Sequence, residues 1–181
     1  MQNNAAIENI LSRTSVRSFK DKPLEISTIE TLLRAGMAAP SAMNKQPWHL
    51  VVVSKRSTLN AIAQATPNAG PAAQAPLAIV VCGDMHKVAQ DWVKDFWPQD
   101  TAALTENILL AANALDLGAV WTGIYPSEER CNLISQLLNL PSHLIPFATI
   151  VIGYPQEKPT PKDKWDTSAI SFETFGGKRE G

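Results

Sequence analysis

The sequence predicts a single layered domain in which helices and strands alternate. Four short apolar runs that lack a helical period have the pattern of buried strands, and amphipathic or alanine-rich segments separate them. The chain has 181 residues, a length typical of one domain, and contains no internal repeat and no linker that would divide it. We therefore expect residues 1–181 to form one domain of packed helix and sheet layers.

The chain is expected to begin with a short helix and an extended segment. Ile7, Ile10 and Leu11 have helical spacing, so this first helix should end near Arg13. The next residues, RTSVRSFKDKP, have no such period and should be extended or irregular up to Pro23.

A second helix is expected to begin at Ser27 and to end near Ala38. Ser27 and Glu30 have the spacing of a capping box, and Pro40 prevents the helix from continuing. After the polar loop PSAMNKQPW, the β-branched run HLVVVS is predicted to be a buried strand.

The middle of the chain continues the alternation. A short helix is expected behind Ser57, followed by a Pro/Gly/Ala-rich connection and a second strand, LAIVVCGD. The segment HKVAQDWVKDFW is predicted to be helical. The longest helix should cover about residues 98–116, with Gly118 in the C′ position that ends it, and its alanines would allow close packing at the centre.

The last third of the chain should contain the remaining strands, AVWTGI and FATIVIGYP. Between them, Ser127 is expected to cap a helix whose first-turn Glu128 and Glu129 suit the helix dipole, and which ends before Pro141. From Gln156 onward the chain is polar and rich in proline and lysine. Residues 156–181 should therefore wrap over a surface, such as that of a neighbouring subunit.

The composition excludes several classes of protein. The 16 Lys and Arg residues balance 17 Asp and Glu residues, which argues against a nucleic-acid or anionic-membrane surface over the whole molecule. The apolar runs are far shorter than the ~20 residues of a membrane span, and the N-terminal residues lack a signal-peptide pattern. Charged residues form 18% of the chain, below the usual ~25%, which predicts a surface covered by another subunit or a ligand.

The cysteines and histidines indicate neither a disulfide scaffold nor a metal site. Cys82 and Cys131 are too few for a disulfide framework, so a reduced, cytoplasmic protein is expected. His49, His86 and His143 are scattered, with no partner at i+3 or i+4. The sequence therefore predicts no zinc site.

An alternating Arg-Ser-Arg motif is the first candidate for ligand binding. No strand is followed by a G-x-G-x-x-G turn or a Walker lysine, so side chains would have to bind any phosphate. In an extended segment Arg13, Ser15 and Arg17 point to one face, and their guanidinium groups and hydroxyl suit a phosphate. A solvated basic edge beside a helix end is the alternative interpretation.

The polar loop before the first strand is the second candidate. Ser41, Asn44 and Gln46 offer donors and acceptors that suit the imide edge of a heterocycle, although the same residues are typical of ordinary turns.

Later in the chain, Gly123 would let a ligand approach the backbone at the end of a strand, or would form a bulge. Lys162 and Lys164 could supply cations to an anion site or form a solvated charge run.

Taken in order, these motifs resemble the FMN-dependent nitroreductase family. The matching segments are RTSVRSF, AAPSAMNKQPW, APLAIVV, LGAVWTG and IGYP, followed by a lysine-containing tail, and together they span nearly the whole chain. The resemblance implies an α+β fold, a three-layer αβα sandwich with a mixed, mainly antiparallel central sheet. It also implies an intertwined homodimer that binds FMN at the subunit interface.

The resemblance implies roles for individual residues of the first motif. Arg13 and Ser15, with Thr14 between them, would hold the FMN phosphate together with Lys162 and Lys164. Arg17 would face the pyrimidine end of the isoalloxazine, where a fixed cation stabilises the negative charge of the reduced ring and raises its potential.

Other cofactor-binding residues are implied at matching positions. Thr122 and Gly123, next to Trp121, would lie beside the flavin N5. Asn68 would touch the pyrimidine edge, where Pro71 replaces the lysine of larger members. The other subunit would contribute the residues of the polar loop, namely Pro40, Ser41, Ala42, Asn44 and Gln46.

The activity implied is that of an NAD(P)H oxidoreductase. Hydride from NADH or NADPH would pass through the flavin N5 to a flat, electron-poor acceptor such as a nitroaromatic or a quinone, in a ping-pong sequence, with no catalytic side chain. Residues 85–97 would cover the pocket. The alternatives are a reductive dehalogenase, a flavin oxidase, or a non-catalytic flavin-binding protein used for storage or sensing.

Overall fold

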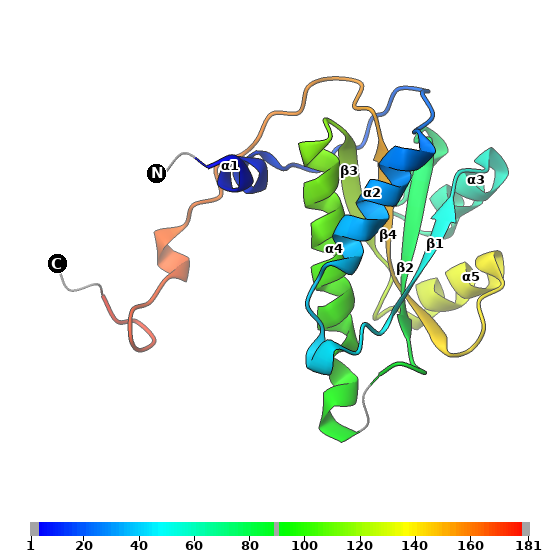
Figure 1. The fold of residues 1–181 in the computed structure, drawn as a ribbon. Coiled ribbons are helices and arrows are strands. Elements are labelled where there is room, and N and C mark those ends of the chain that lie inside the picture. The colour runs from blue at the N-terminus through cyan, green and yellow to red at the C-terminus, as the bar shows by residue number, and fades with distance from the viewer. Residues whose placement is uncertain (1–3, 89–90, 179–181) are drawn as a thin grey trace.

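The protein has three layers, with a central antiparallel sheet between two layers of helices (Figure 1). This computed structural model describes residues 4–88 and 91–178. The sheet order is β1 (Trp48–Val53), β2 (Leu77–Asp84), β4 (Leu144–Gly153) and β3 (Gly118–Gly123). Ser15 adds an isolated parallel bridge to Ala119. The predicted αβα sandwich with a mainly antiparallel sheet is confirmed.

Two helices cover each face of the sheet. α2 (Ile26–Met37) and α4 (Trp97–Ala114) pack on one face, and α3 (Arg56–Ala65) and α5 (Glu128–Leu138) on the other. The short helix α1 (Ala5–Ser12) lies outside these layers and contacts α4.

Strand β2 is buried on both of its faces. Leu77, Ile79 and Val81 pack in the cluster that contains α2 and α4, whereas Val80 and Cys82 pack in the cluster that contains α3 and α5. Antiparallel strands commonly alternate apolar and polar residues because one face meets water. Here helices cover both faces, which explains why LAIVVCGD shows no alternation.

The predicted elements are present, with some ends displaced. Ser127 caps α5 as predicted, since its hydroxyl accepts a hydrogen bond from the Arg130 N–H. The capping box at Ser27 is wrong. Helix α2 begins one residue earlier, and the Ser27 carbonyl instead accepts a hydrogen bond from the Thr31 hydroxyl within the helix.

Gly118 does not end the long helix, contrary to the prediction. α4 ends at Ala114, and Asp116 takes the left-handed backbone conformation, with φ 56°. Gly118 opens β3, where a Cβ atom would lie 2.6 Å from Val16 Cγ1. The glycine therefore permits the extended segment around Val16 to cross β3 at close range.

The helix predicted over HKVAQDWVKDFW is present only in part. A turn follows β2, and the next described element is a short 3₁₀ helix, Asp91–Phe96, while residues 89–90 lie outside the described part of the chain. The Asp84 carboxylate accepts a hydrogen bond from the His86 N–H and so stabilises the turn in place of a helix.

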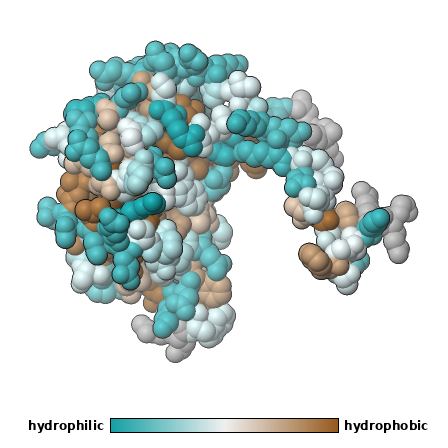
Figure 2. All heavy atoms as spheres, turned by 180° about the vertical axis from the view of Figure 1, so that it is seen from behind, coloured by the Kyte–Doolittle hydropathy of each residue, from teal (hydrophilic) through white to brown (hydrophobic). Residues whose placement is uncertain are grey.

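The end of the chain extends away from the layers (Figure 1). Figure 2 shows that it projects from the body and carries apolar groups near its far end. Trp165 is 74% exposed and Phe175 fully exposed, with Ile170 and Phe172 also exposed between them. None of the helices in the described ranges is both long and apolar enough to cross a membrane.

Candidate functional site

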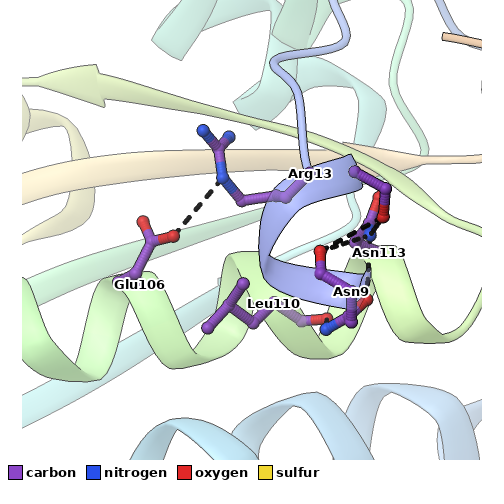
Figure 3. A network of polar contacts seen from close by, with 6 residues as sticks. Asn9, Arg13, Glu106, Leu110 and Asn113 are labelled. Atoms are coloured by element: carbon purple, nitrogen blue, oxygen red, sulfur yellow. Dashed lines mark hydrogen bonds and ion pairs between the residues drawn. The ribbon is translucent and has the colours of Figure 1, made fainter. Parts of the chain in front are cut away.

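Arg13 is held at the end of α1 by a polar contact with α4 (Figure 3). The Asn9 side chain donates to the Leu110 carbonyl at 3.0 Å, and the Asn113 amide donates to the Asn9 side chain at 2.8 Å. These bonds seat α1 on α4. Arg13 Nε consequently lies 3.3 Å from Glu106 Oε1.

The ion pair with Glu106 orients the Arg13 guanidinium but contributes little to the stability of the fold. Glu106 is 45% exposed, and ion pairs that meet solvent contribute at most about 1 kcal/mol. The contact uses Nε, so the two terminal nitrogens of Arg13 keep the forked geometry that suits a phosphate.

A cavity of about 490 Å³ lies between the extended segment and the start of the tail. Thr14, Ser15, Arg17 and Lys162 all line it. The segment is anchored because the Val16 N–H donates to the Ala119 carbonyl at 3.0 Å. Hydroxyl and cationic side chains therefore line one cavity, together with a further cation, Lys158, and the carboxylate of Glu157.

Two predicted phosphate ligands stand apart from this cavity. Arg13 is directed toward α4 instead, and Lys164 lies farther along the exposed tail. Within the described residues, the cavity therefore holds only part of the set that the sequence predicts.

The loop from Pro40 to Trp48 has a strained backbone held by polar contacts. The Ser41 hydroxyl accepts from the Gln46 N–H, and the Ala42 N–H donates to Asp100 Oδ1, both at 2.9 Å. Met43, Asn44 and Gln46 have φ values of 51°, 53° and 50°. The left-handed conformation costs roughly 1–2 kcal/mol for each such residue, and strain of this kind is typical of binding sites.

This loop and Arg13 lie on different sides of α4 within one chain. Asp100 holds the loop and Glu106 holds Arg13. The two acids are six positions apart in the helix, which places them about 9 Å apart along its axis and about 120° apart around it. One copy of the chain therefore does not bring the two predicted groups together.

The end of β3 offers backbone groups and open space. Thr122 is 3% exposed and its hydroxyl donates to the Thr149 carbonyl at 3.0 Å, so its side chain belongs to the sheet. Trp121 is half-buried against Phe147. A Cβ atom at Gly123 would have no neighbour within 4 Å among the described residues. Gly123 is thus accessible to a ligand.

Asn68 is exposed in the turn after α3. Its neighbour Ala69 packs in the same core cluster as Val16, so the fold connects this turn to the extended segment that contains Ser15 and Arg17.

Asp100 and Glu106 are the site residues that sequence reasoning missed. They are the only acidic residues in α4, and Asp100 is 7% exposed. Two isolated carboxylates in a helix otherwise made of apolar and neutral residues are the signal that could have identified them.

The two cysteines are unsuited to nucleophilic chemistry. Both are free thiols. Burial raises the pKa of Cys82 to about 12 and also raises the pKa of Cys131, with a smaller contribution from the negative charge of Glu128. The reactive thiolate is therefore scarce at neutral pH.

Comparison with known proteins identifies the relatives of the chain. The model of the nitroreductase family matches residues 10–97 and 66–154. A protein of Methanothermobacter thermautotrophicus, provisionally named NADH dehydrogenase/NAD(P)H nitroreductase, is 41% identical over 169 residues, which cover 93% of this chain and 87% of that protein.

Solved structures agree in fold. A protein of Parabacteroides distasonis with the same provisional name has a TM-score of 0.90 and 41% identity, over 95% of this chain and 99% of that one. A provisionally named nitroreductase of Desulfovibrio desulfuricans in complex with FMN has a TM-score of 0.79 and 28% identity, over 96% of this chain and 98% of that one.

Proposed function

The chain belongs to the nitroreductase family, and from this premise we propose that it is an FMN-dependent NAD(P)H oxidoreductase that reduces a flat, electron-poor acceptor. Nitroaromatics and quinones are the acceptor class. Relatives named as NAD(P)H nitroreductases support the donor, and the relative solved with FMN supports the cofactor. The two separate free thiols suit a reducing cytoplasm.

The observation that carries the proposal is the cavity beside the extended segment. Its lining includes the hydroxyls of Thr14 and Ser15 and the cations of Arg17 and Lys162. These hydroxyls and cations suit a phosphate dianion, and Lys158 offsets the charge of Glu157 in the same lining. Arg13 and Lys164 stand apart from the cavity in one chain and would have to turn toward it to complete the donor set. Bound FMN would supply hydride transfer between the nicotinamide and the acceptor.

The protein groups would bind and orient rather than exchange protons. Arg17 would supply a positive charge at the pyrimidine end of the cofactor. The backbone of Thr122 and Gly123 would meet the reacting edge, since Gly123 leaves open space there. Because donor and acceptor would use the same pocket in turn, the kinetics should be ping-pong.

A second copy of the chain would complete the site. The loop residues Pro40, Ser41, Ala42, Asn44 and Gln46 would reach the cofactor from the partner, because within one chain they lie on another side of α4 from Arg13. The exposed apolar groups of α1 and of residues 156–178 would lie against that partner. Residues 1–181 would thus form one domain of an intertwined homodimer.

Absorption and turnover test the proposal together. The purified protein should show flavin absorption near about 450 nm. It should oxidise NADH or NADPH with menadione or a nitroaromatic acid, and double-reciprocal plots at several fixed acceptor concentrations should be parallel. Protein that is loaded with FMN but does not turn over would contradict the reductase and favour storage or sensing.

A further inference from the structure

Three metal-ligating side chains meet at the end of β2, where the Asp84 N–H donates to the carbonyl of Pro47 at the end of the polar loop. Asp84, His86 and His143 each place a ligand atom within 4.8 Å of the others. The two imidazole rings are stacked, with centroids 3.9 Å apart and an interplanar angle of 10°. The sequence places His143 57 positions after His86, so a search for helical spacing finds no relation between them.

Backbone hydrogen bonds hold the two segments together. The Met85 N–H donates to the His143 carbonyl at 2.8 Å, and the His86 N–H donates to Asp84 Oδ1 at 3.1 Å. Asp84 is only 7% exposed, whereas His86 is exposed and His143 half-buried. The carboxylate is therefore fixed in place, and the rings remain accessible from solvent.

The three groups form a donor set that transition metals prefer. Two imidazole nitrogens and one carboxylate oxygen are common ligands of Zn²⁺, with bonds of about 2.0–2.2 Å. Ligand atoms around a tetrahedral ion lie roughly 3.3 Å apart, so the rings must tilt out of their stack to close on an ion. Neither ring has a hydrogen-bond partner within residues 4–88 and 91–178 that would oppose this tilt.

We propose that Asp84, His86 and His143 bind one divalent transition-metal ion, with zinc as the test ion. The ion would join the turn after β2 to the beginning of β4 and leave a coordination position open to water. It would thereby restrain the start of the segment that follows β2. His86 lies in residues 85–97, which the sequence predicts to cover the pocket, but none of the three residues is assigned to flavin binding. Zinc binding can therefore be tested independently of the proposed function.

Lys87 provides an internal check on the proposal. Its ammonium group lies 3.3 Å from Asp84 Oδ2 and 3.2 Å from the Trp48 carbonyl, and the side chain is 50% exposed. The ammonium neutralises Asp84 in the metal-free protein and competes electrostatically with a cation. Removing this charge should strengthen metal binding, whereas general damage to the structure would weaken it.

Equilibrium dialysis of the untagged, flavin-loaded protein against micromolar Zn²⁺, followed by elemental analysis, tests the site. We expect one zinc per chain, and a melting temperature that rises with the zinc concentration. His86→Gln and His143→Gln should each weaken binding by at least about tenfold, because loss of an outer partner alone commonly costs 10–100-fold. Lys87→Met should bind zinc several-fold more tightly.

His49→Gln is the matched control, since His49 is the remaining histidine of the chain and lies outside the cluster. It should retain full zinc binding. The proposal is overturned if the wild type retains no zinc, if both cluster variants bind as tightly as the wild type, or if His49→Gln loses binding equally. A circular-dichroism spectrum of each variant checks that it is folded.

Discussion

At Gly123, an added methyl group should lower flavin binding without affecting folding. Nothing lies within 4 Å of a Cβ atom there, so Gly123→Ala should change the free energy of unfolding by less than about 1 kcal/mol. The same methyl group would occupy space next to the reacting edge of FMN. We expect a folded protein with a lower flavin content, measured as the ratio of flavin to protein absorbance.

Ser57→Thr is the control for this change. Ser57 is exposed in the first turn of α3, so an added methyl group meets solvent there, and the residue is not among the predicted cofactor-binding residues. Its flavin content should equal that of the wild type. Full flavin loading of Gly123→Ala would contradict the assignment of Gly123.

Arg13 is the residue whose loss should most directly release the cofactor. A hydrogen bond to a charged group contributes about 1.5–3 kcal/mol, so Arg13→Ala should weaken FMN binding roughly 10–100-fold. Fluorescence titration of flavin-free protein measures the affinity. Arg34→Ala, at an exposed position in the last turn of α2, should bind FMN normally. Unchanged FMN affinity in Arg13→Ala would refute the phosphate role.

Cys82 should make the protein less stable at alkaline pH. Burial raises its pKa from 9.0 to about 12 in the folded state. The unfolded thiol loses its proton near pH 9, whereas the folded thiol keeps it. The free energy of unfolding therefore decreases as the pH rises from 9 toward 12. At pH 10, the contribution of Cys82 to this decrease is roughly 1.4 kcal/mol.

Urea unfolding at pH 7 and pH 10 measures this loss. Cys82→Ala should show a smaller decrease between the two pH values than the wild type, whatever its stability at pH 7. An equal decrease in both proteins would show that Cys82 does not cause the alkaline effect.

At the scale of elements, the contact between β3 and the extended segment depends on Gly118. A Cβ atom there would lie 2.6 Å from Val16 Cγ1, and overpacking of a buried contact typically costs 1–3 kcal/mol. Gly118→Ala should lower the free energy of unfolding by about that amount, with an unchanged denaturant m value. A stability equal to that of the wild type would show that the segment moves aside without cost.

Local patterns predicted the regular elements well because their causes are local. Strand β2 has the bounds that its apolar run predicts, and the Ser127 cap lies one residue before α5. The predictions failed where contacts between residues distant in the sequence determine the local structure. Gly118 faces Val16, about 100 residues earlier in the chain. At the start of HKVAQDWVKDFW, the preceding Met85 donates its N–H to the carbonyl of His143, far along the sequence, where the pattern predicts a helix.

The candidate site was predictable only in part for the same reason. The Arg-Ser-Arg motif and Lys162 could be recognised from residue type, and the structure brings Ser15, Arg17 and Lys162 to one cavity. Asp100 and Glu106 could be noticed as isolated carboxylates, but their contacts could not be predicted, because their partners lie 58 and 93 positions away in the sequence.

At the scale of the whole molecule, the exposed tail predicts an assembly. Trp165 and Phe175 have little contact with their own chain, and large apolar side chains of this kind mark interfaces. A variant that ends at residue 157 should shift from dimer toward monomer in light scattering and should lose FMN. The double variant Trp165→Ser, Phe172→Ser should shift the dimer toward monomer less than the truncation does. A truncated protein that remains a flavin-loaded dimer would contradict the wrapping role.

Helix α4 has a consequence for how this sequence can diverge. Asp100 holds the polar loop and Glu106 holds Arg13. In the proposed homodimer, these two groups of one chain would contact two different FMN molecules. An insertion of one residue between them would rotate one group relative to the other by about 100°. The spacing of these two acids would thus set the relative orientation of both groups. We expect related sequences to tolerate insertions in the loops or the tail more readily than insertions in this part of α4.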